Sequence, residues 1–442
     1  MKASRLVCEA DAVLAGTLQA LAPSGSKAER TASPQVALDW NVNSVNAVRA
    51  AKTMDGVPAG GPARPLYQTE GLVYTSYVQA AVYDAVMKIS HRYRLYHQFE
   101  ADAGDGSLEA AVISASYHTL VFYLGDPGSS LAAKYSSAIA ALPAGHETDA
   151  GVAVGRAAAD DIESLRAHDG RNASVSNACP VPTNPPTPGA YLCSPPPSAQ
   201  SLQTPWLASM RPFLLTGAEQ VRAPAPPALD SAQYADDLAE TRAYGASNSS
   251  VRTPDQRATA WFWNGNAINA LNQTLRDVAV QHHMDLVDTV RLLAMGVLVT
   301  TDAGIACFDS KYHWLRWRPV TAIRADGDPA DASWTPLVTT PNHPEYPSQH
   351  GCTTTALAEV IASALGTRAI DVTIPGAENG STTLTTSRMF HTVLDLEAEL
   401  VNARVWIGFH YRTSVIRGED LGTAVAEWAL ARYFQVGDDE GD

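Results

Sequence analysis

The 442-residue sequence lacks an uninterrupted apolar run long enough to cross a lipid bilayer. A spanning helix needs roughly 18 to 20 apolar residues in succession, whereas the best stretch, residues 292–299, runs directly into residues 300–302, which are polar. A secretory leader is not predicted either, because Glu9 and Asp11 interrupt the segment after the basic start at residues 1–5. We therefore expect a soluble protein without a membrane span, and export to the periplasm stays open.

Positive charge is also in short supply. The chain has 31 Lys and Arg against 46 Asp and Glu, which gives a formal net charge of −15. A field of this sign repels phosphodiester backbones and anionic lipid headgroups, so nucleic acid is excluded as a partner. An anionic substrate would need a local cluster of cations that works against the field of the whole molecule.

Cysteine is scarce, with five residues in the chain. An odd number cannot pair completely, which leaves at least one free thiol or an intermolecular bond. Cys179 and Cys193 bracket a proline-rich loop that a disulfide between them would close. Two unpaired thiols are an equally consistent interpretation, because the sequence does not identify the compartment.

Apolar side chains are abundant. A composition of 45% hydrophobic and 17% charged residues indicates a folded protein with a sizeable core. Apolar residues recur at helical spacing, and the alternation typical of strands is nearly absent. We expect helices over residues 73–91, 107–124, 127–142, 148–167, 255–299, 353–365, 385–406 and 418–434, with Thr148 as a helix cap. The sequence therefore predicts an all-α fold.

Proline divides these helices into two groups. Between Cys179 and Pro227 lie 13 of the 28 prolines, which denies this stretch regular helix. It also carries large apolar residues that indicate packing against the body, namely Trp206, Met210, Phe213, Leu214 and Leu215. We expect a poorly ordered segment 1–36, a helical bundle 37–170, an ordered lid or linker 171–230, a second bundle 231–436 that holds the active site, and an acidic tail 437–442.

Three clusters in the last third of the chain hold candidate functional residues. The first reads KYHWLRWRP and runs from Lys311 to Pro319. Lys311 and Arg318 lie seven residues apart, about two helical turns, so on a helix they share one face. Two tryptophans between them indicate partial burial, and a partly buried Lys and Arg need an anion. A solvated basic face is the alternative.

The second cluster reads NHPEYPSQHG, begins at Asn342 and precedes an apolar helix. The amides of Ser348 and Gln349 then lie at a helix start, where unpaired N–H groups and the positive end of the helix dipole attract anions. Ser348 adds a hydroxyl, and His350 adds a group that titrates near neutral pH. In the alternative interpretation Ser348 is only a cap and His350 is an exposed residue of the first turn.

The third cluster reads RVWIGFHYR and begins at Arg404. Six residues separate Arg404 from His410, about 240° on an ideal helix, so both meet one ligand only if the helix bends or ends near Gly408. Otherwise they are a surface Arg and a hydrogen-bonded core His. Together the clusters supply the donors that a tetrahedral or trigonal-bipyramidal oxyanion requires, with one His as axial ligand or nucleophile and one as acid–base.

The order Lys-x6-Arg-Pro, Pro-Ser-x-His and Arg-x5-His resembles the signature of the vanadium-dependent haloperoxidase and type 2 phosphatidic acid phosphatase superfamily. The flanking segments that begin at Asp39, Ala80, Trp317 and His343 resemble its soluble bacterial haloperoxidase-like branch. The resemblance covers the chain from about residue 37 to about residue 436 and implies the same all-α bundle fold.

The resemblance implies a role for each residue of the clusters. His410 would bond vanadium or attack phosphorus, and His350 would be the acid–base. His343 would help to set the halide preference, with bromide or iodide favoured over chloride, and a structural loop residue is the other interpretation. The remaining ligands of vanadate or phosphate would be Lys311, Arg318, Ser348, the amide of Gln349, and Arg404.

Two activities are implied for this one site. A haloperoxidase would hold vanadate as cofactor, use Lys311 to polarise bound hydrogen peroxide, and oxidise halide to a hypohalous species that halogenates a small organic substrate. A soluble acid phosphatase would instead form a phospho-histidine at His410, with His350 protonating the leaving alcohol. An oxyanion-binding protein without turnover is a third interpretation. The oligomeric state is not predicted.

Three positions depart from the family pattern. Gln349 replaces a Gly and adds a side chain that restricts the backbone and crowds the anion. Ala403 stands where a Ser normally precedes the Arg, and Ser414 stands where an Asp normally follows His410 by four residues. Ser414 cannot balance an imidazolium by charge, which weakens a nucleophilic role of His410 more than a ligand role. For this reason we expect a haloperoxidase.

Overall fold

The computed structural model describes residues 29, 31–54, 57, 62–171, 173–181, 183, 187–194, 201–326, 331–378 and 383–437. Most of the expected N-terminal segment, up to residue 28, and the acidic tail from residue 438 lie outside these residues.

Helices dominate the described ranges, which confirms the all-α class. The α-helices are α3 (Gln35–Ala50), α4 (Gln68–Ser90), α5 (Leu108–Leu124), α6 (Ser130–Ala140), α7 (His146–Leu165), α8 (Ala232–Gly245), α9 (Pro254–Phe262), α10 (Ala267–Gln281), α11 (Leu286–Trp314), α12 (Pro319–Asp326), α13 (Gln349–Leu365), α14 (Val393–Trp406) and α15 (Arg412–Leu430). Two 3₁₀ turns are η1 (Pro205–Ser209) and η2 (Ala218–Val221). Two antiparallel strand pairs are β1 (Lys52–Thr53) with β2 (Arg64–Pro65) and β3 (Ala369–Ala377) with β4 (Leu384–Thr392).

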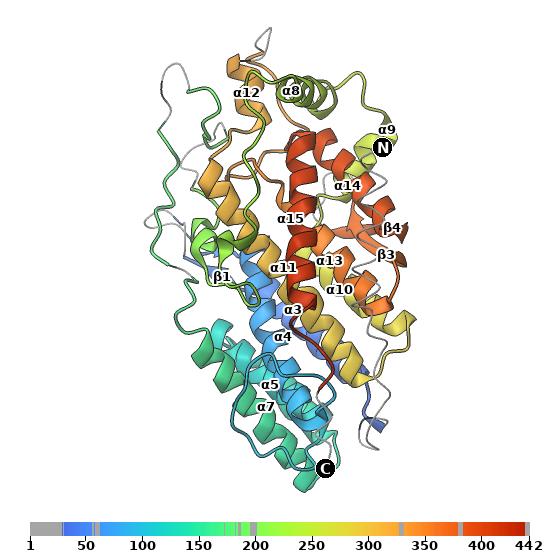
Figure 1. Ribbon diagram of the computed structural model, residues 1–442. Coiled ribbons are helices and arrows are strands. Elements are labelled where there is room, and N and C mark those ends of the chain that lie inside the picture. The colour runs from blue at the N-terminus through green and yellow to red at the C-terminus, as the bar shows by residue number, and fades with distance from the viewer. Residues whose placement is uncertain are drawn as a thin grey trace.

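The 29-residue helix α11 is the centre of the molecule. Helices α4, α10, α13 and α15 pack on it, and Figure 1 shows α4, α5 and α7 at one end of the elongated body and α8 and α12 at the other. By length and mean hydropathy α11 is the one helix in the described residues that could cross a membrane, and its apolar window is 100% buried inside the protein. One continuous apolar cluster runs from Ala37 to Phe434, so both expected bundles share a core, and their exact boundaries stay a prediction.

Two expectations about secondary structure are wrong. Residues 385–392 form strand β4 instead of the start of a helix, because alternate side chains turn inward against β3. Helix α14 begins only at Val393, where Thr392 and Asp395 form a capping box. Thr148 does not cap α7, which starts at His146 after Gly145; the Thr148 hydroxyl donates instead to the carbonyl of Pro143. The helical region 255–299 is divided into α9, α10 and the first half of α11, with Asn266 and Asp285 capping the last two, and α11 continues to Trp314.

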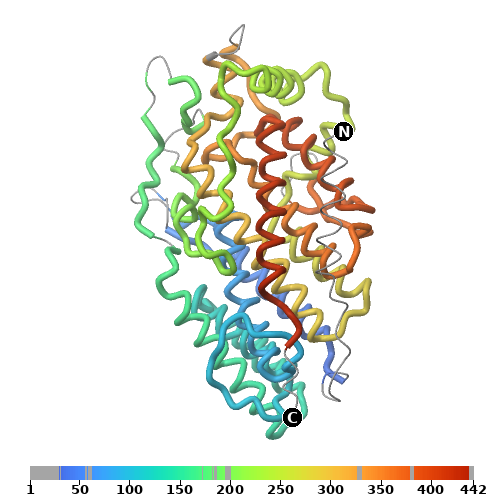
Figure 2. Tube along the Cα trace, viewed as in Figure 1, coloured from blue at the N-terminus to red at the C-terminus, as the bar shows by residue number. Residues whose placement is uncertain are grey.

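The proline-rich segment packs against the body where it is described, and its role as a lid or a linker stays a prediction. Figure 2 shows it running along one side of the molecule, and its five large apolar residues are buried in the core. The backbone amides of Phe213, Leu214 and Leu215 all donate to the carboxylate of Asp302 on α11. A disulfide joins Cys179 to Cys193, which resolves the open pairing, and the buried Cys307 and Cys352 are free.

Candidate active site

The three clusters meet at one cavity of about 440 Å³. Among the described residues that line it there are two arginines and no acid, which gives the cavity a cationic wall. The predicted residues in this lining are Arg318, His343, Gln349, His350, Arg404 and His410. Lys311 and Ser348 are fully buried beneath the same loops and are not part of the lining.

Lys311 lies in the last turn of α11, and its charge is held by the second cluster. Its ammonium donates to the carbonyls of Pro344, Glu345 and Pro347, which uses all three of its N–H groups. Burial lowers the pKa of Lys311 to about 8. The side chain therefore fixes the loop before α13, and it would reach a ligand only by exchanging one of these carbonyls.

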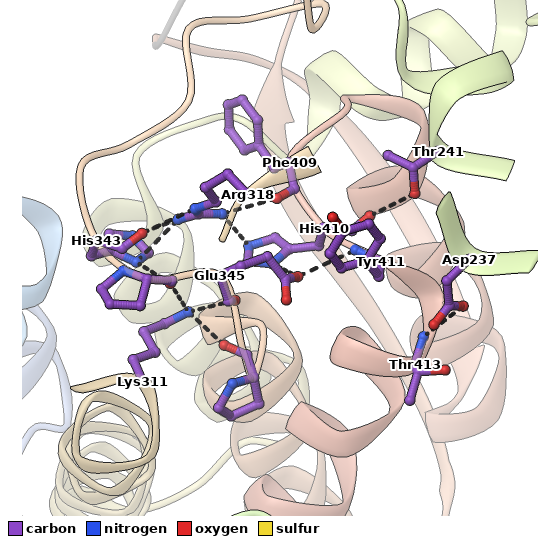
Figure 3. A network of polar contacts seen from close by, with 12 residues as sticks. Asp237, Thr241, Lys311, Arg318, His343, Glu345, Phe409, His410, Tyr411 and Thr413 are labelled. Atoms are coloured by element: carbon purple, nitrogen blue, oxygen red, sulfur yellow. Dashed lines mark hydrogen bonds and ion pairs between the residues drawn. The ribbon is translucent and has the colours of Figure 1, made fainter. Parts of the chain in front are cut away.

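Arg318 is not on the same helix as Lys311, so the expected shared helical face is wrong. Helix α11 ends at Trp314, the next residue, Leu315, adopts a left-handed conformation, and the chain turns before α12 begins. The turn still brings Arg318 beside Lys311 in the interior. The Arg318 guanidinium donates to the carbonyls of His343 and Phe409 at 3.0 Å and lies 3.2 Å from Nε2 of His410, so it connects the second and third clusters (Figure 3).

Ser348 is the N-cap residue of α13, but its hydroxyl makes no capping bond. Its Oγ is buried without a hydrogen-bond partner in the described structure, which does not fit the interpretation that it is only a cap. Gln349 is the first residue of α13, and its φ is negative, a backbone conformation that any residue adopts. The expected restriction of the backbone by this side chain therefore costs nothing at this position. The expected role of the Ser348 amide in anion binding is wrong, because this amide donates to the carbonyl of Ser414 at 2.9 Å. The amide of Gln349, at the helix start, has no acceptor within α13 and can donate to a ligand.

Arg404 and His410 face the same cavity because α14 ends between them. Gly408 adopts φ +84°, and a Cβ there would lie 2.6 Å from the carbonyl oxygen of Gly245, so only glycine allows this reversal. Arg404 is buried, and its Nη1 donates to the carbonyl of Trp263 at 3.3 Å while its Nε has no partner in the described structure. Burial and the nearby Arg318 lower the pKa of Arg404 to about 9.

His410 is held from both ring nitrogens. Nδ1 lies 2.8 Å from Oε1 of Glu345, and Nε2 faces the guanidinium of Arg318 (Figure 3). Since Arg only donates, Nε2 must accept, which leaves the ring proton on Nδ1 for Glu345. Burial and the neighbouring cations hold the pKa of His410 well below its usual range, so the imidazole is neutral.

Glu345 was not identified as a functional residue from the sequence. It is fully buried, and burial raises its pKa to about 7. The available signal was that Glu345 is the one carboxylate in the second cluster, but its partner lies 65 positions further along the chain.

The other two histidines line the cavity. His350, in the first turn of α13, bonds the backbone of Trp263, and burial keeps its pKa well below the usual range. His343 lies against Phe308, with ring centres 5.2 Å apart, and its Nδ1 is 3.1 Å from Nη2 of Arg318. Its pKa is also lowered, mainly by burial. Both rings are therefore neutral and within the same enclosure as His410.

The charge balance of the site favours a bound anion. Lys311, Arg318 and Arg404 are buried cations, and Glu345 is the carboxylate among them. Buried charges of one sign are costly without a partner. Together with the unpartnered hydroxyl of Ser348, this donor set fits an oxyanion such as vanadate or phosphate.

Known proteins with related sequence and structure are vanadium haloperoxidases. Residues 291–438 match a family model described as the VCPO second helical-bundle domain. Vanadium chloroperoxidase from Curvularia inaequalis is 30% identical over 152 residues, a match that covers 27% of this chain and 25% of that enzyme. The sequence match thus spans about a quarter of the relative and falls far short of its whole length.

Solved structures share the fold over nearly the whole chain. A bacterial vanadium-dependent iodoperoxidase has a TM-score of 0.72 at 20% identity, covering 91% of this chain and 98% of that one. A bacterial vanadium-dependent chloroperoxidase in its holo form has a TM-score of 0.67 at 18% identity, covering 94% of this chain and 95% of that one. At such identities the likeness is one of fold.

Proposed function

We propose that this chain, which belongs to the superfamily of vanadium-dependent haloperoxidases and type 2 phosphatidic acid phosphatases, is a vanadate-dependent haloperoxidase. The observation that carries the proposal is the neutral imidazole of His410 within a buried cage of cations, with Nε2 as the acceptor nitrogen. Arg318 occupies the Nε2 lone pair in this structure and would have to release it to a ligand. A nitrogen lone pair is the ligand that vanadium needs, and the cations balance the charge of its oxygens.

The residues that would hold vanadate are those with unused donors. Arg404 offers Nε, Ser348 offers its hydroxyl, and Gln349 offers its amide. Arg318 adds charge and orients His410, and Lys311 adds charge from behind the loop. When bound, vanadate supplies a Lewis-acidic centre that activates hydrogen peroxide toward attack by halide.

His350 and His343 supply the other functions of the cavity. His350 is neutral, so its free ring nitrogen can take a proton from incoming hydrogen peroxide and return it to a leaving oxygen. His343 lies beside Arg318 at the same wall, and we propose that it sets a preference for bromide or iodide over chloride.

An apolar recess of about 60 Å³ adjoins the cavity, which is room for one small apolar group of an organic substrate. The recess and the cavity share His350, and the recess walls include Phe262, Trp263, Leu271 and Leu357. An apolar group of the substrate would lose contact with water there, which favours binding. The substrate would then be halogenated within reach of the acid–base residue.

A soluble acid phosphatase is the second candidate, and Glu345 is the observation that favours it. The carboxylate missing at Ser414 is supplied by Glu345, which would stabilise a positively charged phospho-histidine at His410. The same cations would stabilise the phosphoryl transition state. An oxyanion-binding protein without turnover is the remaining candidate.

Two assays on the purified chain separate these candidates. With orthovanadate, hydrogen peroxide and bromide or iodide, a haloperoxidase should halogenate a phenolic dye, and the reaction should stop when vanadate is removed. Without vanadate, release of nitrophenol from nitrophenyl phosphate would support the phosphatase. Binding of orthovanadate with neither reaction would support the third candidate and contradict the first.

A further inference from the structure

We propose that Glu345 is the positioning residue of His410. This carboxylate, which belongs to the second cluster, fills the role that the family pattern gives to an Asp at position 414. The inference rests on the proposed function of the site. It concerns how the imidazole is oriented and which nitrogen it presents, and it assigns to Glu345 no contact with the reacting groups.

The carboxylate is fixed by two donors. Oε1 of Glu345 accepts from Nδ1 of His410 at 2.8 Å and from the backbone N–H of Tyr411 at 3.2 Å. Glu345 and His410 are 0% and 2% exposed, so water does not compete for these bonds. Figure 3 shows the carboxylate on one side of the ring and Arg318 on the other.

The two sides of the ring require one tautomer. Arg318 can only donate toward Nε2, and the carboxylate can only accept from Nδ1. In the other tautomer an N–H would point at a guanidinium N–H, and Nδ1 would face a carboxylate with no proton between them. Glu345 therefore favours the tautomer in which Nε2 carries the lone pair, which accepts from Arg318 in this structure and would bind a ligand once that guanidinium turns to the oxyanion.

The backbone that carries Glu345 is anchored on several sides. Its amide donates to the carbonyl of Arg316 at 3.0 Å, and its carbonyl accepts from the ammonium of Lys311. The hydroxyl of the next residue, Tyr346, donates to the carbonyl of Pro224 at 2.7 Å. A carboxylate on a backbone held this way can orient its partner without shifting itself.

The surroundings of Ser414 explain why a carboxylate can stand at position 345 or at position 414, but not at both. It lies in the first turn of α15, its carbonyl accepts from the amide of Ser348 at 2.9 Å, and its side chain lies against the carboxyl of Glu345. A second carboxylate at this position would face the first in a buried site, where like charges repel strongly. The small hydroxyl of Ser414 is therefore the match for Glu345, and the two positions should be exchangeable.

The inference is tested by moving the carboxylate from position 345 to position 414, with the variants Glu345→Leu, Ser414→Asp and the double variant. Histidine-selective ¹⁵N–¹H NMR on the protein without vanadate should find the strongly downfield Nδ1–H signal of His410 that a hydrogen bond to a buried carboxylate produces, its loss in Glu345→Leu, and its return in the double variant. Glu419→Leu, the same substitution on α15 away from His410, should keep the wild-type Nδ1–H signal.

Calorimetric titration with two anions distinguishes a loss of ring positioning from a structural disturbance of the whole anion site. Orthovanadate, which would bond through Nε2 under the proposed function, should bind Glu345→Leu about 10- to 100-fold more weakly, as is typical when the partner of a ligating His is lost. Inorganic phosphate needs no such bond and should bind no more weakly, because a negative charge has been removed. Ser414→Asp alone should weaken both anions.

The inference is overturned if Glu345→Leu keeps the wild-type Nδ1–H signal of His410, if it weakens both anions equally, or if the double variant behaves like the single one. Should Glu345→Leu fail to fold, Glu345→Gln decides. Its amide oxygen can still accept from Nδ1, so most of the orthovanadate affinity should persist while the Nδ1–H signal moves upfield, because the acceptor is neutral. An unchanged signal, or a loss of affinity of about 10-fold or more, contradicts the proposal. Failure of the proposed function is a separate outcome, namely no halide oxidation by a wild type that still gives these Nδ1–H and affinity changes.

Discussion

At the scale of single residues, the site depends on His410 more than on any other histidine of the cavity. Its Nε2 is the nitrogen that faces the cationic cage. We predict that His410→Ala lowers halide oxidation by more than the roughly 100-fold loss typical of an outer partner. His391→Ala on β4, an exposed histidine outside the cavity, should leave the rate unchanged. Near-normal turnover of His410→Ala in the dye assay would contradict the site assignment.

The residues that bear chemistry could be found from the sequence, but some of their partners could not. Arg404 and His410 stand in one short motif, and the condition that the helix end near Gly408 is met. The contact between Glu345 and His410 depends on how two loops fold together, which no local pattern encodes. The saturation of Lys311 by three carbonyls is likewise a property of the folded loop.

At the scale of elements, the reversal after α14 rests on Gly408. An alanine there would combine an unfavourable positive φ with contacts at 2.6 Å to Gly245 and 2.9 Å to Pro336. We predict that Gly408→Ala lowers the free energy of unfolding by more than the roughly 1–3 kcal/mol of backbone strain alone. Gly128→Ala is the matched control, since its φ is +91° and nothing lies within 4 Å of the added carbon. Equal losses in urea denaturation would show that the close approach at Gly408 is unimportant.

The packing of α15 against α14 buries carboxylates and makes stability depend on pH. Burial, with help from Glu397 and Asp420, raises the pKa of Glu419 from 4.5 to about 8. The folded state therefore holds a proton that the unfolded state has released, so this contribution to stability is present below about pH 4.5 and is lost as the pH rises through 8. Glu419→Gln should raise the Tm at pH 8 by more than at pH 5, whereas Glu147→Gln at an exposed site of α7 should not. A pH-independent effect of Glu419→Gln would contradict this.

Helix periodicity predicted most of the helices, because apolar residues recur along their buried faces. It failed where tertiary packing overrides the helix preference of a segment's own sequence. Residues 385–392 pair with β3, a partner that the sequence of β4 alone does not reveal. The seven-residue spacing of Lys311 and Arg318 suggested one helix, yet the chain reverses at Leu315 and brings them together by a different path.

At the scale of the whole molecule, a bound oxyanion should stabilise the fold, because the cage buries Lys311, Arg318 and Arg404 against the single carboxylate of Glu345. A ligand at 100 times its Kd adds about 2.7 kcal/mol to the free energy of unfolding. We predict that orthovanadate or phosphate raises the Tm by several degrees relative to chloride at equal ionic strength. Arg404→Ala should remove most of this shift, and an equal shift in that variant would contradict the role of Arg404.

The net charge of −15 opposes the approach of the same anions. Salt screens this repulsion, with a Debye length of about 10 Å at 0.1 M. The association rate of orthovanadate, measured by stopped-flow, should therefore rise between low salt and about 0.15 M. A rate that falls with salt would mean that the local cations outweigh the field of the whole molecule at the entrance.

Two side chains of helix α11 hold separate parts of the chain by hydrogen bonds. The carboxylate of Asp302 accepts from backbone amides of the proline-rich segment, and nine residues later the ammonium of Lys311 donates to the loop that carries Glu345. Nine residues of helix span about 13 Å, so both sets of hydrogen bonds are made from one short, rigid stretch of helix. An insertion that displaces the proline-rich segment from Asp302 would therefore shift α11 and, through Lys311 and the loop of Glu345, change the orientation of the His410 ring. The altered segment itself would not contact the reacting groups.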